Sequence, residues 1–253
     1  MRIFLIIIFL SLFSFAHSQE LLPTFTKETV GLFELNSTGW ELAVYKGKIK
    51  PNGNVRYFQI GFQEFIHPRE ERSFFDISST INDERRRSFK LGKLVNFYSL
   101  HGTLGHKQYL TKLTQKKGVL LALNYRGGLS LGLEKPYYLT YIQFDTQSDN
   151  VTLEDFKFSE ENRDFFNGAF LPNETLYGAA GFGTGFNEFK VIPGLHLSTG
   201  IVLDWTTTSN FQRQFEMGLE SYIYTREVQL ILDNNPQSIF LNIYARIGFG
   251  GKS

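Results

Sequence analysis

The stretch GVLLALNYRGGLSLGL, residues Gly118–Leu133, alternates between two kinds of side chain. Apart from Gly127, the odd positions from Leu121 to Leu133 carry large apolar side chains, and the even positions carry small or polar ones plus Arg126. A period of two predicts a β-strand, because successive side chains of a strand point to opposite faces. The second face is typical of the crowded, hydrated interior of a narrow barrel that has lipid outside. We therefore predict an all-β fold, a transmembrane antiparallel up-and-down β-barrel.

The same alternation recurs along the chain and gives the expected strand count. Eight segments show it, at 40–45, 58–63, 89–110, 118–133, 137–144, 195–204, 215–223 and 241–249. Glu134–Pro136 is expected to form a tight turn between the fourth and fifth of them. Two further segments, Val30–Leu35 and Leu176–Phe186, are ambiguous. Barrels of this kind close with an even number of strands, so we expect eight to ten strands, with nine excluded.

Two long connections, 67–88 and 146–190, separate these segments. Both termini of such barrels lie in the periplasm, and their long loops lie outside the cell. With eight strands, 146–190 is expected outside the cell and 67–88 becomes a long periplasmic connection. With ten strands some of these sides are exchanged.

The first 18 residues have the pattern of a secretory signal peptide. Arg2 precedes an apolar run, Ile3–Phe15, and Ala16-His17-Ser18 follows as a cleavage signal. We predict cleavage near Ser18, which leaves 19–253 as a single barrel domain. A retained membrane anchor is less favoured, because the run is shorter than the roughly 20 apolar residues that span a bilayer. The chain has no cysteine, which suits a bacterial periplasm or outer membrane.

Composition excludes some classes of function. Arg2 is the only charged residue of the predicted signal peptide, so the 26 basic residues of the chain fall to 25 and match its 25 acidic ones. A chain with balanced charge lacks the excess of basic residues that binding to nucleic acid requires, so this class of function is not expected. The five histidines show no metal-ligand spacing, so we predict neither a metal site nor a cofactor. The aromatic content of 16% suits the interfacial girdles of a membrane barrel.

Three groups of short sequence motifs resemble those of small outer-membrane β-barrel proteins of Bacteroidetes-type bacteria. They are His67-Pro68-Arg69-Glu70, Gly127–Gly132 with Lys135–Leu139, and Gly181-Phe182-Gly183 followed by Val191–His196. The resemblance implies an outer-membrane barrel and no activity, since such proteins are mostly uncharacterised. Some small barrels of these bacteria are accessory subunits of protein export or outer-membrane assembly, which makes an envelope protein complex a candidate partner.

Several charged residues fall on the inferred inner face of the barrel. They are Glu41, Arg126, Glu134, His196, Asp204, Glu216, Glu220 and Arg246. Isolated charges in a narrow lumen are costly, so we expect a salt-bridged network that fills it. A selective pore is the alternative, but an eight-stranded barrel has an interior just wide enough for side chains.

A catalytic site on the barrel wall is a further alternative. His196, Ser198 and Asp204 share one strand face. At about 3.3 Å per residue, His196 and Ser198 lie about 6.6 Å apart and Asp204 about 26 Å away from His196, so these three cannot form a triad. An acid of a neighbouring strand, Glu216 or Glu220, remains possible, as in a lipid A acyl hydrolase or transferase. We predict no catalytic residue and a hydrogen-bonded histidine.

A charged segment supplies a candidate interaction surface. It contains five arginines, Arg69, Arg72, Arg85, Arg86 and Arg87, with acids between them. They could bind lipopolysaccharide phosphates or an acidic partner, and the alternative is a solvated loop.

The sequence therefore predicts a non-enzymatic outer-membrane barrel with a structural or accessory role. Its expected partners are outer-membrane lipid, lipopolysaccharide and an envelope protein complex, without nucleic acid. A small pore, a lipid-modifying barrel enzyme and a soluble periplasmic β-sandwich that binds a ligand remain as alternatives.

Overall fold

The computed structural model describes residues 25–51, 53–70, 72–73, 87–110, 119–144, 151–163, 176–205, 210–232 and 234–253. The predicted signal peptide and its cleavage site lie outside these ranges.

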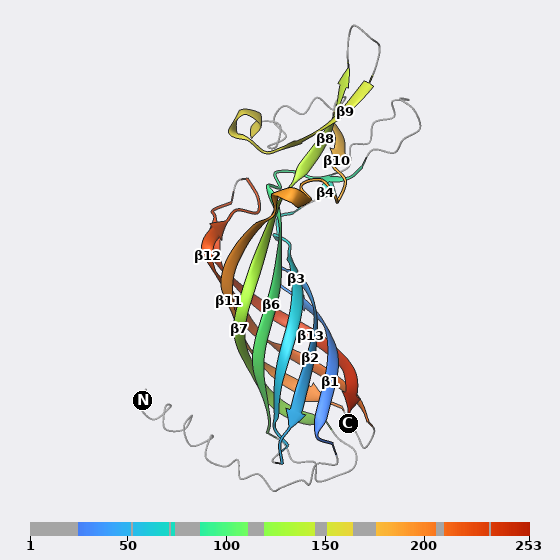
Figure 1. Cartoon of the computed structure of the whole chain (residues 1–253), viewed down its shortest axis with the longest axis vertical. Helices are drawn as coiled ribbons and strands as arrows, with labels where there is room; N and C mark the ends of the chain where they lie inside the picture. Colours follow the sequence, from blue (N-terminus) through green and yellow to red (C-terminus); the bar gives the residue numbers. More distant parts are fainter. Residues whose placement is uncertain are drawn as a thin grey trace.

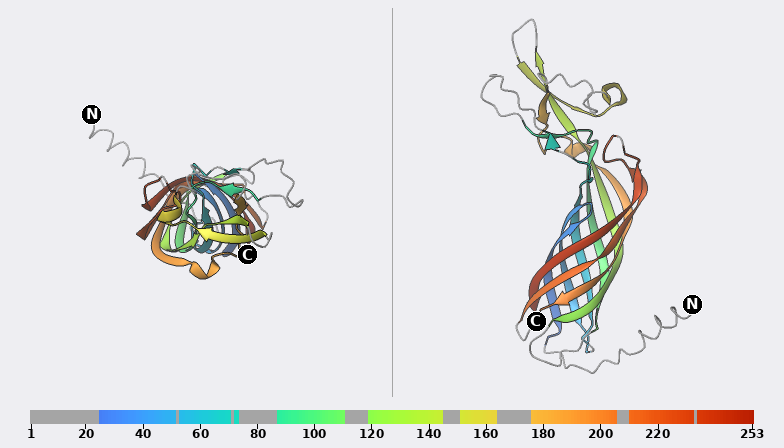
Figure 2. Two further views of the ribbon diagram at one scale, coloured as in Figure 1. Left: turned by 90° about the horizontal axis from the view of Figure 1, so that it is seen from above. Right: turned by 180° about the vertical axis from the view of Figure 1, so that it is seen from behind.

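Eight long antiparallel strands close into a barrel in the order β1-β13-β12-β11-β7-β6-β3-β2 (Figure 1). Their bounds are β1 Lys27–Asn36, β2 Gly39–Ile49, β3 Val55–Phe65, β6 Val95–Tyr109, β7 Leu120–Pro136, β11 Lys190–Asp204, β12 Phe211–Val228 and β13 Gln237–Lys252. The first and last of them pair with each other, so the sheet has no free edge. Seen from above, the strands surround one axis (Figure 2, left). This confirms the predicted barrel, and the closed sheet excludes the β-sandwich alternative.

One segment predicted as a barrel strand lies outside the barrel, and one ambiguous segment takes its place in the wall. The ambiguous segment Val30–Leu35 belongs to β1 in the barrel wall, whereas the segment 137–144 forms β8, Tyr138–Phe144, outside the barrel. Val30 and Leu32 of β1 point inward and are buried, so apolar side chains on both faces hide the alternation. The seven residues of β8 are fewer than the 9–11 that cross a bilayer as a strand.

A small sheet continues from the barrel wall at the end opposite the termini (Figures 1 and 2). The predicted turn at Glu134–Pro136 is wrong, because β7 runs to Pro136 and β8 follows at once. β8 pairs with β9, Val151–Lys157, and with β10, Leu176–Ala179, so the second ambiguous segment is also outside the barrel. The remaining short elements are β4 Arg72–Ser73, β5 Phe89–Lys90 and the 3₁₀ helices η1 Glu160–Asn162 and η2 Phe186–Glu188.

The connections divide unequally between the two ends of the barrel. Those at the end with the termini, such as β2–β3 and β11–β12, are short, and the β3–β6 and β7–β11 connections lie at the other end. The prediction that 67–88 leaves the barrel at the end with the termini is therefore wrong, because β1 adds a crossing before it. The 146–190 connection leaves at the end opposite the termini, as predicted for eight strands, since the loss of β8 from the wall cancels the gain of β1. Among the residues that the structure describes, no helix is long and apolar enough to cross a bilayer.

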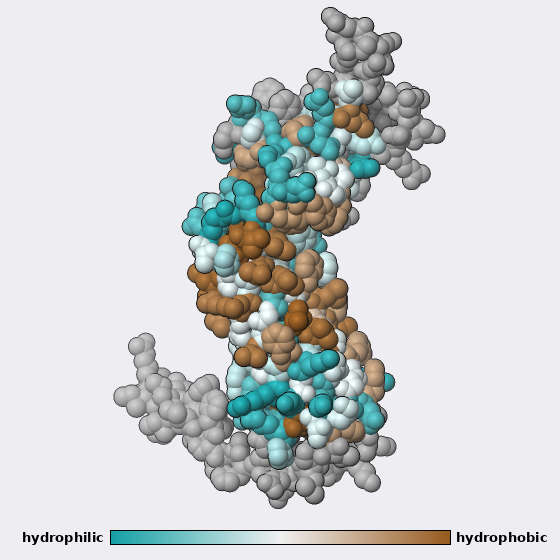
Figure 3. All heavy atoms as spheres, in the orientation of Figure 1, coloured by the Kyte–Doolittle hydropathy of each residue, from teal (hydrophilic) through white to brown (hydrophobic). Residues whose placement is uncertain are grey.

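The outer wall of the barrel is apolar and the inner wall polar. Figure 3 shows apolar residues as a belt on the visible face, with hydrophilic residues at both ends. In β7, Leu129 is 70% exposed while Arg126 and Ser130 are buried. Leu241 and Ile243 of β13 are equally exposed on their outer face, and Asn242, Tyr244 and Arg246 are buried. This alternation is the one predicted from the sequence.

Candidate functional site: the filled lumen

The middle of the lumen holds carboxylates and guanidinium groups in direct contact. Arg126 Nη1 lies 3.3 Å from Glu216 Oε1, and its Nη2 lies 3.8 Å from Glu34 and 3.7 Å from Glu220. Arg246 donates a hydrogen bond to Glu34 and lies 4.0 Å from Glu216. All five side chains are buried. With Glu41, which is also buried, they form what we call the central cluster.

Two histidines lie beside the central cluster. His196 Nε2 is 3.3 Å from Glu220 Oε2, and His101 Nε2 is 3.5 Å from Glu41 Oε1. The two imidazole rings have centroids 4.6 Å apart, and His196 stacks on Tyr222 at 4.3 Å. Both histidines are buried. They therefore join the carboxylates to the aromatic side chains above them.

Ser198 does not contact His196 as a nucleophile would. Its hydroxyl donates to Tyr244 Oη at 3.2 Å, and Tyr244 donates in turn to Glu216 at 2.5 Å. Glu220 does pair with His196, as its position on the neighbouring strand allows. A nucleophile needs a hydrogen bond to its base, and Ser198 and His196 do not make one.

The central carboxylates also have the composition of a cation site. Glu34, Glu41 and Glu220 each offer an oxygen, and these oxygens lie within 4.8 Å of one another. The Arg126 guanidinium lies close to two of these three carboxylates, so the protein supplies a positive charge of its own there. The group is therefore an internal ion-pair network.

A second polar cluster fills the lumen near the termini. Lys107 Nζ lies 2.8 Å from Glu28 and donates to Tyr45 Oη at 3.0 Å. Tyr109 donates to Asp204 at 2.7 Å. Lys107, Glu28, Tyr45 and Asp204 are buried, and Tyr109 is half-buried. Asp204 therefore belongs to this lower cluster, apart from His196.

An aromatic layer closes the lumen on the other side of the central cluster. Phe65, Phe97, Tyr222, Tyr224 and Phe240 pack there with neighbouring aliphatic residues. The Phe65 and Phe240 rings lie 4.9 Å apart, and the Phe97 and Tyr224 rings 5.0 Å apart. Ion pairs, aromatic rings and the lower cluster therefore fill the lumen at three successive levels.

The outer connections are joined above the aromatic layer. The N–H of Leu94 donates to the carbonyl of Leu230 at 2.9 Å, and that of Leu232 donates to Gly92 at 2.8 Å. These bonds join the β3–β6 connection to the β12–β13 connection.

The buried carboxylate of Glu70 holds the β3–β6 connection in place. It lies 2.8 Å from Lys93, accepts a bond from Lys90, and accepts another from the backbone N–H of His67 at 3.1 Å. Burial alone would raise the pKa of Glu70, but the positive charge of Lys93 and these hydrogen bonds outweigh it and lower that pKa. Burial lowers the pKa of Lys93 to about 8, although Glu70 opposes that shift.

Glu70→Gln is expected to loosen the outer connections, because it leaves Lys93 buried without its counter-charge. Amide hydrogen exchange of 89–95 and 230–232 should accelerate by roughly 10- to 100-fold. In the wild type the same loss is expected as the pH falls below about 4, since a lowered carboxyl pKa stabilises the fold only while the group is ionised. Lys93 contributes with the opposite sign, because its lowered pKa costs stability at neutral pH and that cost shrinks above about pH 8.

The matched control is Glu188→Gln, which breaks an exposed pair with Lys157 at the same end of the protein. Exposed ion pairs contribute little, so exchange in 89–95 should stay unchanged. Equal exchange in Glu70→Gln and the wild type, after correction for intrinsic rates, would contradict the assignment.

Glu134 is not part of the central cluster, contrary to the prediction. It lies near the outer end of β7, where its carboxylate accepts a bond from Arg226 at 2.9 Å and lies 3.7 Å from Lys190. Both basic side chains are exposed. Alternate side chains of a strand point into the lumen only where the strand is part of the barrel wall. Glu134 lies close to the point where the wall ends.

The predicted inner residues thus fall into three places. The structure brings Arg126, His196, Glu216, Glu220 and Arg246 together and separates Asp204 and Glu134 from them. Glu34, His101 and Lys107 are network members that the sequence analysis missed. His101 and Lys107 share the parity of Thr103 on β6, which is a signal that could have found them.

The five arginines of the charged segment are only partly described. Arg85 and Arg86 lie outside the described residues, and of Arg72 only the backbone in β4 is described. Arg69 and Arg87 are exposed. The N–H of Arg87 donates to the carbonyl of Tyr177 at 3.1 Å, which ties this segment to β10.

No protein-family model matches the chain, and no curated protein matches it. Among solved structures, the chain is similar to Neisserial surface protein A (NspA), with 8% sequence identity and a TM-score of 0.39 over 90% of this chain and 97% of the other. It is also similar to the N-terminal β-barrel domain of Pseudomonas aeruginosa OprF, with 9% identity and a TM-score of 0.32 over 92% of this chain and 99% of the other. Both similarities are too distant to transfer a role to this chain.

Proposed function

We propose that this chain is an outer-membrane barrel with a structural or accessory role, whose lumen is a filled support and whose working surface lies outside it. The observation that carries the proposal is the lumen itself. It is filled by the lower cluster, the central cluster and the aromatic layer in succession. A closed, apolar-faced barrel with short turns at the terminal end and long connections at the other matches the orientation in which the termini lie in the periplasm.

The filled lumen argues against a pore. An eight-stranded barrel has an interior that side chains can fill, and here large side chains such as Arg246, Tyr222 and Phe65 are fully buried in it. Moving ions through the centre would require separation of the Arg126 and Glu216 pair in a low-dielectric interior. That separation is costly because each charge is left unpaired.

The same burial argues against a lipid-modifying enzyme. His196 is fully buried, so a lipid acyl chain outside the wall has no path to its imidazole. The Ser198 hydroxyl donates its hydrogen bond to Tyr244 Oη, and among the described residues it makes no hydrogen bond to a histidine or carboxylate that could activate it. The histidines instead act as members of the network that stiffens the barrel.

The small sheet and the outer connections are the surface left for a partner. β8, β9 and β10 stand beyond the barrel, and the exposed Arg69 and Arg87 lie at the same end. On the proposed orientation this end faces the cell exterior, where lipopolysaccharide phosphates and cell-surface protein complexes lie. Membership of an export or assembly complex, and the kinship with Bacteroidetes-type barrels, stay predictions from the sequence resemblance.

Planar-bilayer recording tests the proposal. The folded protein should give no discrete conductance steps at voltages up to those that a bilayer withstands, because ion pairs and packed rings block its axis. A porin of known conductance, reconstituted in parallel, is the positive control, and a heat-modifiable shift on gels verifies folding. Regular unitary steps from the folded protein would replace the proposal with the pore.

A further inference from the structure

A row of basic side chains crosses the outer wall of the barrel near the end that carries the termini. Lys27 of β1 lies directly opposite Lys48 of β2, Lys48 lies opposite Arg56 of β3, and Arg56 lies opposite His106 of β6. Lys46 points to the same face of β2, two residues farther from that end. All are exposed except His106, which is half-buried. We call these five residues the basic row.

The basic row has no acidic partner in the part of the chain that the structure describes. Like charges directly opposite on neighbouring strands destabilise a sheet. Within the described residues, no carboxylate lies within 4.0 Å of the ammonium and guanidinium groups of Lys27, Lys46, Lys48 and Arg56. Glu28, which follows Lys27 on β1, points into the lumen and pairs with Lys107. The positive charge of the row therefore faces outward, where an anion from the surroundings can neutralise it.

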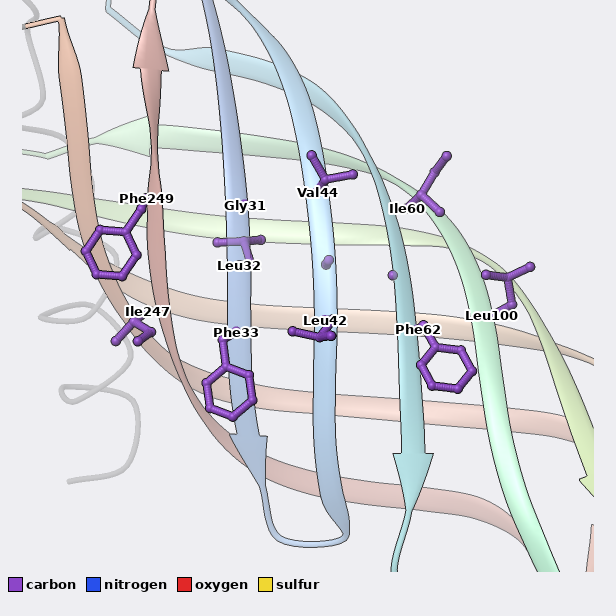
Figure 4. Close-up of a pocket in the computed structure, with 12 residues that line it drawn as sticks. Gly31, Leu32, Phe33, Leu42, Val44, Ile60, Phe62, Leu100, Ile247 and Phe249 are labelled. Carbon is purple, nitrogen blue, oxygen red and sulfur yellow. The ribbon is translucent and has the colours of Figure 1, made fainter. Parts of the chain in front are cut away.

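The apolar wall beside the basic row is hollowed in two places. Figure 4 shows the first hollow, of about 600 Å³, where Gly31 leaves a gap between Phe33, Val44 and Phe249. The second hollow has about 500 Å³, and Gly127 forms part of its floor. Glycine on an outward position removes a side chain from the lipid-facing surface, so the wall is lower there than at the large apolar side chains around it.

Both hollows adjoin the basic row. Arg56 and His106 line one side of the second hollow, and Leu104 and Leu197 line another. Val44, in the first hollow, lies two residues before Lys46 on β2, which is about 7 Å at the rise of a strand. A ligand that fits must therefore carry a negative head next to apolar chains.

We propose that the basic row and the first hollow form a binding site for an anionic glycerophospholipid of the membrane leaflet at the terminal end of the barrel. The lipid phosphate binds Lys46, Lys48 and Arg56, and its acyl chains lie over Gly31 in the first hollow. A basic side chain near a membrane surface favours an anionic lipid roughly fivefold, so three of them give a preference of roughly 100-fold. That this leaflet is the periplasmic one rests on the proposed function, whereas the binding itself does not.

Native mass spectrometry of the delipidated, folded protein tests the site. The protein in detergent is titrated with phosphatidylglycerol and, separately, with phosphatidylcholine of the same acyl chains. We expect a one-to-one adduct with phosphatidylglycerol that forms at least tenfold more tightly than the phosphatidylcholine adduct. Equal retention of the two lipids would overturn the proposal, whatever the conductance recordings show.

Variants separate the head-group contacts from the first hollow. The triple variant K46Q/K48Q/R56Q should lose the preference by at least tenfold, while the control K157Q/K190Q/R226Q removes three cations at the other end and should keep it. Gly31→Leu fills the first hollow, and a Cβ there has its closest neighbour, the carbonyl oxygen of Phe249, at 3.8 Å, so the backbone accepts it. It should weaken phosphatidylglycerol binding severalfold at unchanged charge.

A charge-conserving variant and a competition experiment with an acidic peptide complete the test. K46R/K48R/R56K should retain binding, which shows that the charges act and that the wall is intact even if the glutamine variant folds poorly. Preference that survives K46Q/K48Q/R56Q in a folded barrel would overturn the proposal. A soluble polyglutamate peptide that binds more tightly than phosphatidylglycerol, and displaces it at equimolar concentration, would also overturn the proposal and would identify the row as a docking surface for an acidic protein.

Discussion

Arg126→Met is expected to lower the free energy of unfolding by about 3–5 kcal/mol, the cost of removing one partner from a buried charge network. The Arg126 side chain is fully buried and lies within 3.3–3.8 Å of the carboxylates of Glu34, Glu216 and Glu220. Methionine keeps much of the apolar stem, so the loss reports the charge. Urea unfolding in phospholipid vesicles, followed by the fluorescence of Trp40 and Trp205, measures it.

The matched control is Arg213→Met on β12. Arg213 is exposed and lies over the Phe211 ring at 5.3 Å, so its loss should change stability by no more than about 0.5 kcal/mol. The double variant Arg126→Met/Glu216→Gln should recover part of the loss, because it removes a carboxylate that has lost its partner. If Arg126→Met and Arg213→Met unfold at the same urea concentration, the central cluster does not stabilise the barrel.

Leu129→Arg is expected to cost about 2–4 kcal/mol, the penalty for arginine on the lipid face near the bilayer midplane. Leu129 lies near the middle of β7 and points outward, opposite Leu195 of β11. The guanidinium would have to stay in hydrocarbon or reach a distant interface. The same urea assay measures the difference.

The control for this substitution is Leu153→Arg, which places the same residue on β9 outside the barrel. Leu153 is 53% exposed, so a charge there stays in water and the stability should be unchanged. An equal cost at both positions would indicate damage to local packing instead of a lipid-facing wall.

The sequence was sufficient for the barrel wall wherever inner and outer faces differ in polarity. β7, β11 and β12 show that contrast, and their alternation predicts both the strands and the inward side chains. β1 lacks it, because Val30 and Leu32 are apolar and point inward. β8 shows the period of a strand, but periodicity cannot tell a membrane strand from a strand of an exposed hairpin. Only length separates the two, and β8 is too short.

The sequence predicts which residues belong to the candidate site better than it predicts which of them contact each other. Parity places Arg126, Glu216 and Arg246 on the inner wall, and burial of charge requires that they pair. Which acid pairs with which base depends on strand register and on the closing β1–β13 contact, which brings Glu34 opposite Arg246. The aromatic layer was hidden for another reason. Phe65, Phe97 and Phe240 point inward, against the rule that the inside is polar.

The central claim is that alternate side chains of a closed barrel touch hydrocarbon, and cysteine labelling tests it most directly. Since the chain has no cysteine, single cysteines at Leu129, Leu219 and Ile243 can be challenged in intact membranes with a water-soluble thiol reagent, with Leu153→Cys as the exposed control. We predict rapid labelling at residue 153 and none at the other three until detergent or denaturant is added. Labelling of all four positions at similar rates in intact membranes would contradict the account.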